Sequence, residues 1–303
     1  MGFARHESIS LAIIRTSIVL LVGQTVLTLV LCMAAHVFRV VRSDVAYHST
    51  RGDNDEIFLL DFERGLEVNL TRNPAWDSAP ARSPDGKRVA FASLRDGNQE
   101  IYVIDIESGN VTRLTDNLAR DIHPSWSPDG EYITFASDRS GNWDIFSMRA
   151  DGSDVRQLID DPSNDDEPLW SPDGQKIAFT SYRGNWAIYL MNPDGSDVQL
   201  ISDPRVRNIE PAWSPDGTML VSTSDPAYMG NFELYTLSRD GKNQRRLTMN
   251  PAWDAGAVWV DANHLVFSST RDGKTNPELY IMDSDGNNVR RLTFNNFRDG
   301  DPS

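Results

Sequence analysis

The sequence predicts an all-β fold, a six-bladed β-propeller closed by its two terminal strands and preceded by one transmembrane α-helix. Three observations support this prediction. A Ser-Pro-Asp-Gly tetrapeptide recurs at 83–86, 127–130, 171–174 and 214–217, with spacings of 44, 44 and 43 residues. Short segments of alternating apolar residues follow each copy, and one long apolar segment lies near the N-terminus. A period of this length is typical of propeller blades.

The long apolar segment covers residues 16–38, which are 23 residues without Asp, Glu, Lys or Arg. This length spans a hydrocarbon core of about 30 Å. We expect an uncleaved signal anchor with residues 1–15 as its tail, because the apolar region of a cleaved signal peptide is only about 7 to 15 residues long. The positive-inside rule barely favours either membrane orientation, because two arginines lie on each side of the segment: Arg5 and Arg15 before it, Arg39 and Arg42 after it.

Composition excludes several kinds of partner and site. The formal net charge is −15, and four arginines and one glutamate lie in residues 1–42, which leaves 25 basic against 43 acidic residues, or −18, for the remainder. Such a domain repels nucleic acid. The single cysteine, Cys32, excludes an intramolecular disulfide and a cysteine-based zinc site.

The third repeat shows how each period divides into four strands. They are expected at 169–170, 176–181, 186–192 and 198–201, where apolar residues alternate with polar ones. Pro193-Asp194-Gly195 reads as the hairpin between the last two strands. The other copies have Asp151-Gly152, Asp240-Gly241 and Asp285-Gly286 at this place. Each Ser-Pro-Asp-Gly is turn chemistry, since Pro presets one dihedral and Gly tolerates a positive φ.

The two ends of the repeat region predict how the ring closes. Residues 44–303 contain six periods, but residues 45–51 match the second strand of a repeat, 177–183, so the first blade lacks its innermost strand. Residues 299–303 match the first strand at 121–125. The two ends are therefore expected to complete one blade together, which removes exposed strand edges.

The repeat also resembles that of a known family. Asp-x-x-Pro-x-Trp-Ser-Pro-Asp-Gly, then Ile-x-Phe-x-Ser-x-Arg, Ile-Tyr-x-Met, Asp-Gly and Leu-Thr, is similar to the TolB-like (WD40-like) β-propeller repeat over residues 44–303. The resemblance implies a propeller that works outside the cytoplasm as a docking platform for proteins or peptides at its channel mouth. The chain departs from TolB in lacking the extra N-terminal α/β domain.

An acid stands five positions before the tryptophan of nearly every repeat, at Asp77, Asp121, Asp165, Asp254 and Asp299. These acids form either a ring at a channel mouth or ion pairs with the arginine of the Ser-x-Arg loop. Blade order predicts the pairs Asp77–Arg95, Asp121–Arg139, Asp165–Arg183, Asp254–Arg271 and Asp299–Arg51. The remaining repeat has Asn208 and Pro226, so both charges are lost together, which favours the ion pairs.

Three positions before the tryptophan come His123, Glu167, Glu210 and Asp301. They are candidates for a divalent-cation site, for contacts with a cationic peptide, or for a solvated channel lining. No cofactor is expected beyond this possible cation.

Aromatic residues fall into two groups. Trp126, Trp170, Trp213 and Trp259 recur at the blade period and are expected to pack in the core, with Arg82 replacing one of them. Trp143 and Trp186 lie in rim loops together with Trp76 and Trp253, and are candidates for partner contact or for covering a blade end.

These features favour a non-enzymatic, membrane-tethered interaction platform of the cell envelope, with its propeller on the extracytoplasmic side. The chain enters the first blade on the face of the Ser-Pro-Asp-Gly turns, so the opposite, membrane-distal face is expected to bind a protein or peptide. The alternative is a metal-dependent hydrolase with its site at His123, Glu167 and Glu210.

Overall fold

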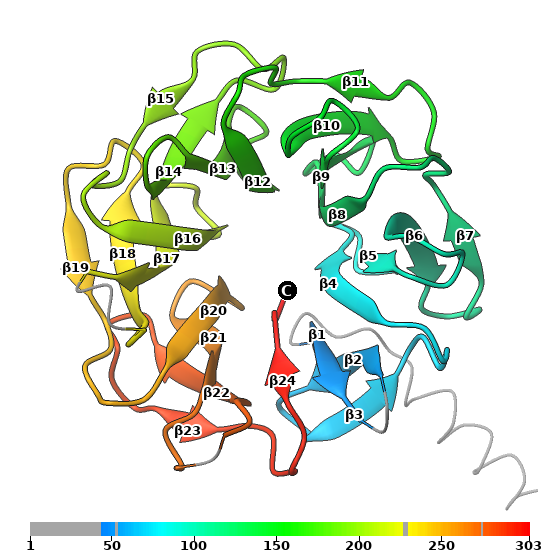
Figure 1. Cartoon of the computed structure of the whole chain (residues 1–303). Helices are drawn as coiled ribbons and strands as arrows, with labels where there is room; N and C mark the ends of the chain where they lie inside the picture. The colour runs from blue at the N-terminus through cyan, green and yellow to red at the C-terminus, as the bar shows by residue number, and fades with distance from the viewer. Residues whose placement is uncertain (1–43, 52–53, 227–229, 274) are drawn as a thin grey trace, which may run out of the picture. The chain divides into compact units, whose positions relative to one another are not determined.

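The protein is described by a computed structural model that covers residues 44–51, 54–226, 230–273 and 275–303. Six four-stranded antiparallel sheets surround a central channel (Figure 1). The predicted six-bladed, all-β propeller is confirmed. The predicted transmembrane segment, 16–38, lies outside the described residues, and within them no helix is long and apolar enough to span a bilayer.

Each blade is listed from its innermost to its outermost strand. Blade 1 contains β24 (Asp299–Gly300), β1 (Asp44–Thr50), β2 (Asp55–Asp61) and β3 (Leu66–Asn69). Blade 2 contains β4 (Asp77–Arg82), β5 (Arg88–Ser93), β6 (Glu100–Asp105) and β7 (Val111–Arg113). Blade 3 contains β8 (Asp121–Trp126), β9 (Tyr132–Ser137), β10 (Asp144–Arg149) and β11 (Arg156–Gln157).

Blade 4 contains β12 (Asn164–Trp170), β13 (Ile177–Tyr182), β14 (Trp186–Met191) and β15 (Gln199–Leu200). Blade 5 contains β16 (Arg207–Trp213), β17 (Met219–Asp225), β18 (Glu233–Ser238) and β19 (Gln244–Arg246). Blade 6 contains β20 (Asp254–Trp259), β21 (His264–Ser269), β22 (Glu278–Asp283) and β23 (Arg290–Arg291). The innermost strand of blade 4 begins five residues earlier than predicted, at Asn164.

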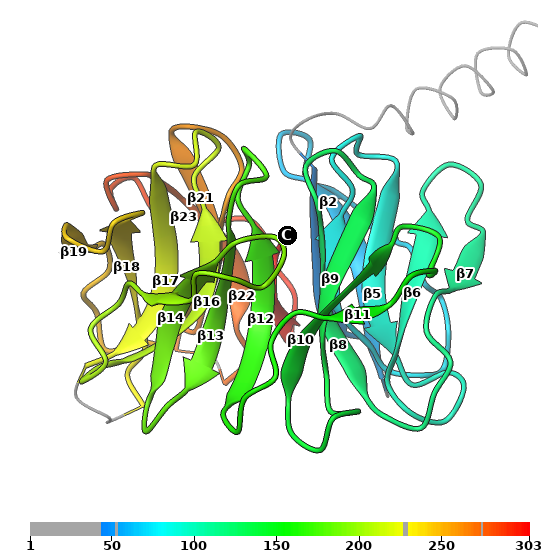
Figure 2. The same ribbon diagram turned by 90° about the horizontal axis from the view of Figure 1, so that it is seen from above.

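The strand connections define two faces, seen edge-on in Figure 2. We call the face with the Ser-Pro-Asp-Gly turns and the hairpins between third and fourth strands the turn face. The loop face carries the connections between second and third strands and those from one blade to the next. The described chain begins at Asp44, on the turn face, because β1 is a second strand.

Blade 1 is completed by both ends of the described chain, as predicted. His48 and Ser49 of β1 pair with Gly300 and Asp299 of β24. Beyond β24, the Ala46 N–H donates to the Ser303 carbonyl at 3.0 Å, and the Ser303 N–H donates back to Ala46 at 2.7 Å. The ring is thus closed by main-chain hydrogen bonds between segments more than 250 residues apart.

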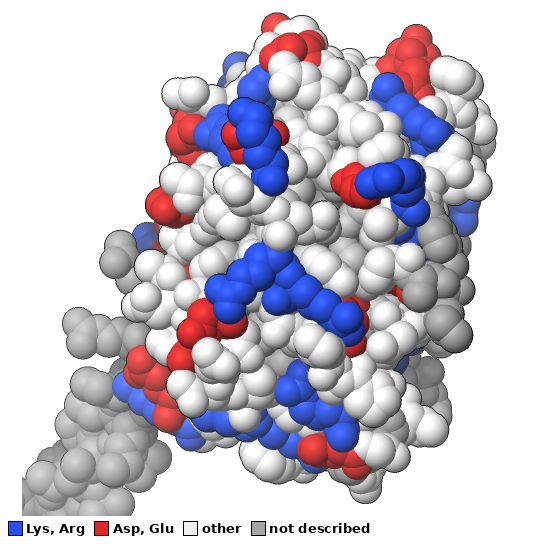
Figure 3. Space-filling view, turned by 90° about the vertical axis from the view of Figure 1, so that its left-hand side faces the viewer, with Lys and Arg blue, Asp and Glu red and all other residues white. Residues whose placement is uncertain are grey.

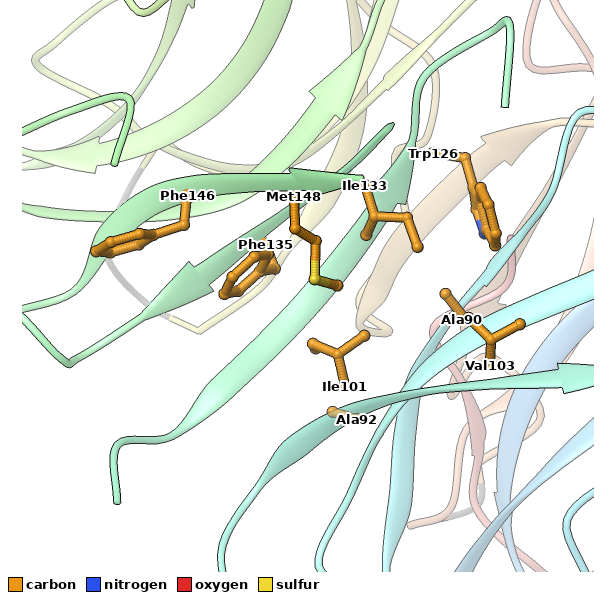
Figure 4. Packing of buried hydrophobic residues seen from close by; sticks show 9 residues of the cluster. All are labelled: Ala90, Ala92, Ile101, Val103, Trp126, Ile133, Phe135, Phe146 and Met148. Atoms are coloured by element: carbon orange, nitrogen blue, oxygen red, sulfur yellow. The ribbon is translucent and has the colours of Figure 1, made fainter. Parts of the chain in front are cut away.

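The hydrophobic core lies between neighbouring blades. In Figure 4, aliphatic residues of blade 2 face larger and aromatic ones of blade 3, together with one isoleucine: Ala90, Ala92, Ile101 and Val103 against Trp126, Ile133, Phe135, Phe146 and Met148. Removing these faces from water joins each blade to the next. The repeated tryptophans add a polar contact, since the indole N–H of Trp126 donates to the Ala81 carbonyl of the preceding blade at 3.1 Å.

Arg82, which replaces a tryptophan, also donates a hydrogen bond to a main-chain carbonyl of the preceding blade. Its guanidinium donates to the carbonyl of Asp44 in blade 1. The indole N–H of Trp213 likewise donates to Leu169 of the preceding blade at 3.2 Å. Both residue types therefore connect an innermost strand to the main chain of the blade before it.

The outer surface of blades 4 to 6 mixes charges of both signs (Figure 3). Several arginines there are paired: Arg239 with Asp173 at 2.7 Å, Arg246 with Glu233 at 2.6 Å and Arg291 with Asp272 at 2.7 Å. Pairing of this kind leaves no broad surface of one sign on this side of the propeller.

Candidate functional site

The four predicted channel residues occupy one structurally equivalent position on or directly after the innermost strand, and Ala79 and Gly256 hold this position in the other two blades. The six residues have left-handed backbone conformations: Ala79 (φ 49°), His123 (50°), Glu167 (53°), Glu210 (53°), Gly256 (60°) and Asp301 (47°). In blades 2 to 6 the pairing with the second strand shifts register at this point. Such a bulge bends the strand and re-aims its side chain.

These positions line a cavity of about 280 Å³ in the channel. The residue after each bulge is proline in five of the six blades: Pro80, Pro124, Pro168, Pro211 and Pro302. His123, Glu167, Glu210 and Asp301 therefore do lie together, as the sequence predicted, and they share the cavity with an apolar wall that includes Leu169, Ala257 and Val258. Non-glycine residues at positive φ are strained, and such positions recur at functional sites.

Two of the predicted acids also join neighbouring blades. The Glu167 carboxylate accepts the Glu210 N–H at 2.7 Å, and the Glu210 carboxylate accepts the Gly256 N–H at 2.8 Å. Each carboxylate therefore satisfies a main-chain donor at the bulge of the next blade. Hydroxyl groups of Thr180 and Thr223 donate to the same two acids.

Two histidines lie against the other acids of this region. His123 Nδ1 lies 2.6 Å from Asp166 Oδ1, and His48 Nδ1 lies 3.0 Å from Asp301 Oδ2. Sequence reasoning missed Asp166, although it directly precedes Glu167 in the same strand. It also missed His48, whose role depends on the return of the C-terminal strand beside β1.

The electrostatics of the channel follow from these contacts. Burial lowers the pKa of His123, but Asp166, Glu167 and Asp301 outweigh burial and raise the pKa to about 10. Burial raises the pKa of Asp301, but His48 and His123 outweigh it and hold the pKa at about 2. Burial and neighbouring acids raise the pKa of both Glu167 and Glu210. At neutral pH the channel therefore carries both signs of charge.

The described part of the chain contains no set of side chains arranged as metal ligands. No three or more of its His, Cys, Asp and Glu side chains are grouped so as to hold a metal ion. Glu167 and Glu210 each use one carboxylate oxygen on a main-chain N–H. The divalent-cation site, one of the three roles considered for His123, Glu167 and Glu210, thus has no geometric support among the described residues.

Three of the five expected ion pairs are present. Arg95 lies 3.1 Å from Asp77, Arg139 lies 2.8 Å from Asp121, and Arg271 lies 3.0 Å from Asp254. Each acid is buried at the start of an innermost strand, and each arginine also donates through Nε to the serine of its Ser-x-Arg loop. In blade 5, the uncharged Asn208 accepts instead from Ser224 at 2.6 Å.

The expected pair Asp165–Arg183 does not form. Arg183 lies 2.5 Å from Asp161 instead. Asp165 is fully buried and has neither an arginine nor an asparagine as a hydrogen-bond partner, although the Ser181 hydroxyl lies beside it. The cause is Asp161, a carboxylate that attracts the arginine where other blades have an asparagine. Comparison of Asn117, Asn250 and Asn295 with Asp161 in the sequence would have revealed it.

The expected pair Asp299–Arg51 does not form either. Arg51 lies 2.7 Å from Glu67 and donates to the Tyr47 hydroxyl at 2.8 Å. Tyr47 stands where blades 2, 3, 4 and 6 have phenylalanine, so among these five blades only blade 1 offers the arginine a tyrosine hydroxyl at this position. Asp299 accepts from the Ser49 hydroxyl at 2.5 Å.

The aromatic candidates are only partly available to a partner. Trp143 and Trp186 are half-buried, the first beneath the Arg120 guanidinium at 4.8 Å and the second beside Tyr182 at 5.6 Å. Trp76 is exposed on the loop face. The expected packing role fits Trp126 and Trp213, which are buried, and Trp170 and Trp259, which pack against core clusters.

Comparisons with known proteins agree with the propeller fold. The family described as "TolB beta propeller domain" matches residues 37–159, 141–225 and 168–303. No curated protein matches the chain in sequence.

Solved structures show the same fold at low identity. TolB from Acinetobacter baumannii is 22% identical with a TM-score of 0.74, and the match covers 86% of this chain but 66% of that one. A putative TolB from Agrobacterium tumefaciens is 21% identical with a TM-score of 0.69, over 82% of this chain and 88% of that one. An oligogalacturonate lyase in complex with manganese is 15% identical with a TM-score of 0.59, over 84% and 74%. Since the family model matches most of the length of this chain, the chain belongs to the TolB β-propeller domain family.

Proposed function

We propose that this protein is a non-enzymatic interaction platform of the cell envelope, tethered to the membrane by residues 16–38, which binds a protein or peptide partner on its loop face. The observation that carries the proposal is the distribution of exposed apolar side chains. Leu118, Met249, Phe294 and Trp76 are each more than half exposed. All four lie in connections from one blade to the next, on the loop face. Exposed apolar side chains gathered on one face mark interaction sites.

The channel supports a binding role more than a catalytic one. Its carboxylates are engaged in contacts between blades, and its cavity opens among proline and small apolar residues. A cavity of this kind suits a short apolar or mixed segment of a partner. His123, Glu167, Glu210 and Asp301 then provide polar contacts that orient it. Trp143, directly before β10, and Trp186, the first residue of β14, lie toward the loop face.

Site-specific photo-crosslinking tests the binding face. A photoreactive phenylalanine analogue placed at Trp76, 56% exposed on the loop face, is expected to capture a partner in intact cells. The same analogue at Leu66, 48% exposed beside a turn-face hairpin, is the control. Capture from both positions alike, or from Leu66 alone, would contradict the proposal.

A reporter fusion tests the location. The proposal expects a periplasmic reporter fused after Ser303 to be active and a cytoplasmic reporter at the same place to be silent. The described chain begins at Asp44 on the turn face, so the loop face would then point away from the membrane. Cytoplasmic activity would overturn the extracytoplasmic placement while leaving the binding face open to the crosslinking test.

A further inference from the structure

The junction between blades 3 and 4 carries more negative charge than its counterparts. At three other junctions, an asparagine side chain donates to the buried acid of the next blade: Asn117 to Asp121 at 2.8 Å, Asn250 to Asp254 at 2.6 Å and Asn295 to Asp299 at 2.8 Å. The equivalent residue before Asp165 is Asp161, which has no proton to donate when ionised.

A second substitution at this junction removes a positive charge. In blades 2, 5 and 6, the buried glutamate that begins the third strand pairs with an arginine: Glu100 with Arg113, Glu233 with Arg246 and Glu278 with Arg291. In blade 3 the acid is Asp144, and the arginine position holds Gln157, whose amide donates at 3.0 Å. Asp144, Asp161 and Asp165 thus share a single ion-paired cation among the described residues, Arg183.

Arg183 interacts with two carboxylates: it forms an ion pair with Asp161, and its charge also acts on Asp165. Its guanidinium carbon lies 4.7 Å from the centre of the Tyr189 ring. The arginines of blades 2, 3 and 6 lie 4.7 to 5.0 Å above the equivalent ring, yet they pair with the buried acid. Arg183 thus lies over the ring from which its counterparts reach the buried acid, while Asp165 has no arginine or asparagine as a hydrogen-bond partner.

We propose that the loop face at blade 4 binds a cationic side chain, lysine or arginine, of a partner: the incoming cation takes Asp161, and Arg183 moves to Asp165. This inference rests on the loop face being the binding face. Exposed aromatic surface lies on the same connection as Arg183, because Tyr182, directly before it, is exposed and its ring lies 5.6 Å from the Trp186 ring. Aromatic faces attract cations. The described carboxylates are not grouped to hold a metal ion, which favours an organic cation.

The move gives both Asp161 and Asp165 a cationic partner. Before binding, Asp165 is buried beside the Ser181 hydroxyl without a cationic partner, while Asp161 and Arg183 are paired near the surface, where each is about one third exposed or less. After binding, Arg183 satisfies Asp165 as its counterparts do in blades 2, 3 and 6, and the ligand satisfies Asp161. Charge-assisted hydrogen bonds of this kind are directional and recognise the guanidinium group well.

The test is an NMR titration of the full-length protein in detergent with the tripeptide acetyl-Gly-Arg-Gly-amide. The citrulline analogue serves as the uncharged ligand. Saturable shifts are expected at the Arg183 Nε–H and the Trp186 indole N–H with the arginine peptide only. In Asp161→Asn, affinity should fall roughly tenfold, and the Arg183 signal without peptide should resemble that of the saturated wild type. Asp116→Asn, which removes an exposed loop-face acid between blades 2 and 3, is the control and should bind as wild type.

The outcomes separate this inference from the proposed function. Absence of saturable shifts at Arg183, equal affinity in Asp161→Asn, or equal shifts with the citrulline peptide would overturn the cation site. The same Arg183 shift on adding calcium chloride alone would replace it with an ion site. Crosslinking from Trp76 uses no peptide, so its result judges the binding face independently of this site.

Discussion

Replacing Gly195 with alanine is expected to lower the free energy of unfolding by about 3 kcal/mol or more. Gly195 lies in the hairpin between β14 and β15 with φ +84°, and a Cβ placed there would lie 2.1 Å from the carbonyl oxygen of Leu158 in blade 3. The obstacle is main chain, so no side-chain rotation relieves the clash. Either the hairpin or the neighbouring blade must shift. Urea unfolding followed by tryptophan fluorescence measures the loss.

Gly109→Ala is the matched control. Gly109 lies in the equivalent hairpin of blade 2 with φ +71°, but nothing lies within 4 Å of a Cβ built there. Alanine at this place costs only the strain of a positive φ, about 1 kcal/mol. A Gly195→Ala loss no larger than that of Gly109→Ala would contradict the contact between blades.

The two glycines differ in a property that the sequence does not reveal. The sequence predicts a turn at Asp194-Gly195 because turn chemistry is local. The approach of Gly195 to Leu158 is not local, since it depends on how closely two blades pack, and no pattern of residues reports that distance. Gly152, Gly241 and Gly286 make the same approach to their preceding blades.

The six blades and their closure could be predicted because both rest on the repeat period and on matching the two ends of the repeats. The channel positions could be predicted by their distance from the repeated tryptophan. Their left-handed conformation could not, because only Gly256 among the six is a residue type that signals it. The use of Glu167 and Glu210 as acceptors for main-chain donors in the next blade follows from that hidden bulge.

The failed ion pairs have a different cause. Their prediction assumed that each arginine has one available acid, which holds in blades 2, 3 and 6. In blade 4 a second acid, Asp161, competes for Arg183. In blade 1 Glu67 competes for Arg51. Competition between partners is decided by three-dimensional distance, although the exchange of asparagine for Asp161 is visible in the sequence.

Asp161→Asn is expected to stabilise the protein at neutral pH, by on the order of 2 to 4 kcal/mol. Burial raises the pKa of Asp165 to about 7, with Asp161 and Asp144 adding to the rise and Ser181 and Arg183 opposing it. Asparagine at 161 would release Arg183 to Asp165 and could donate to it as Asn117 does to Asp121. The lost Arg183–Asp161 pair is partly exposed and is worth about 1 kcal/mol at most.

The sign of the pH dependence distinguishes this mechanism from a general gain in stability. Below about pH 4, Asp165 of the wild type is protonated in both the folded and unfolded states and imposes no penalty. As the pH rises from about 4 to 7, the unfolded chain releases the proton that the folded protein retains, so wild-type stability falls until the pKa of about 7 is passed. With Arg183 on Asp165, that carboxyl ionises in the folded state too, and its penalty disappears. Urea unfolding at pH 4, 6 and 8 should therefore show a difference between the two proteins that grows with pH, whereas a constant offset would contradict the transfer of Arg183.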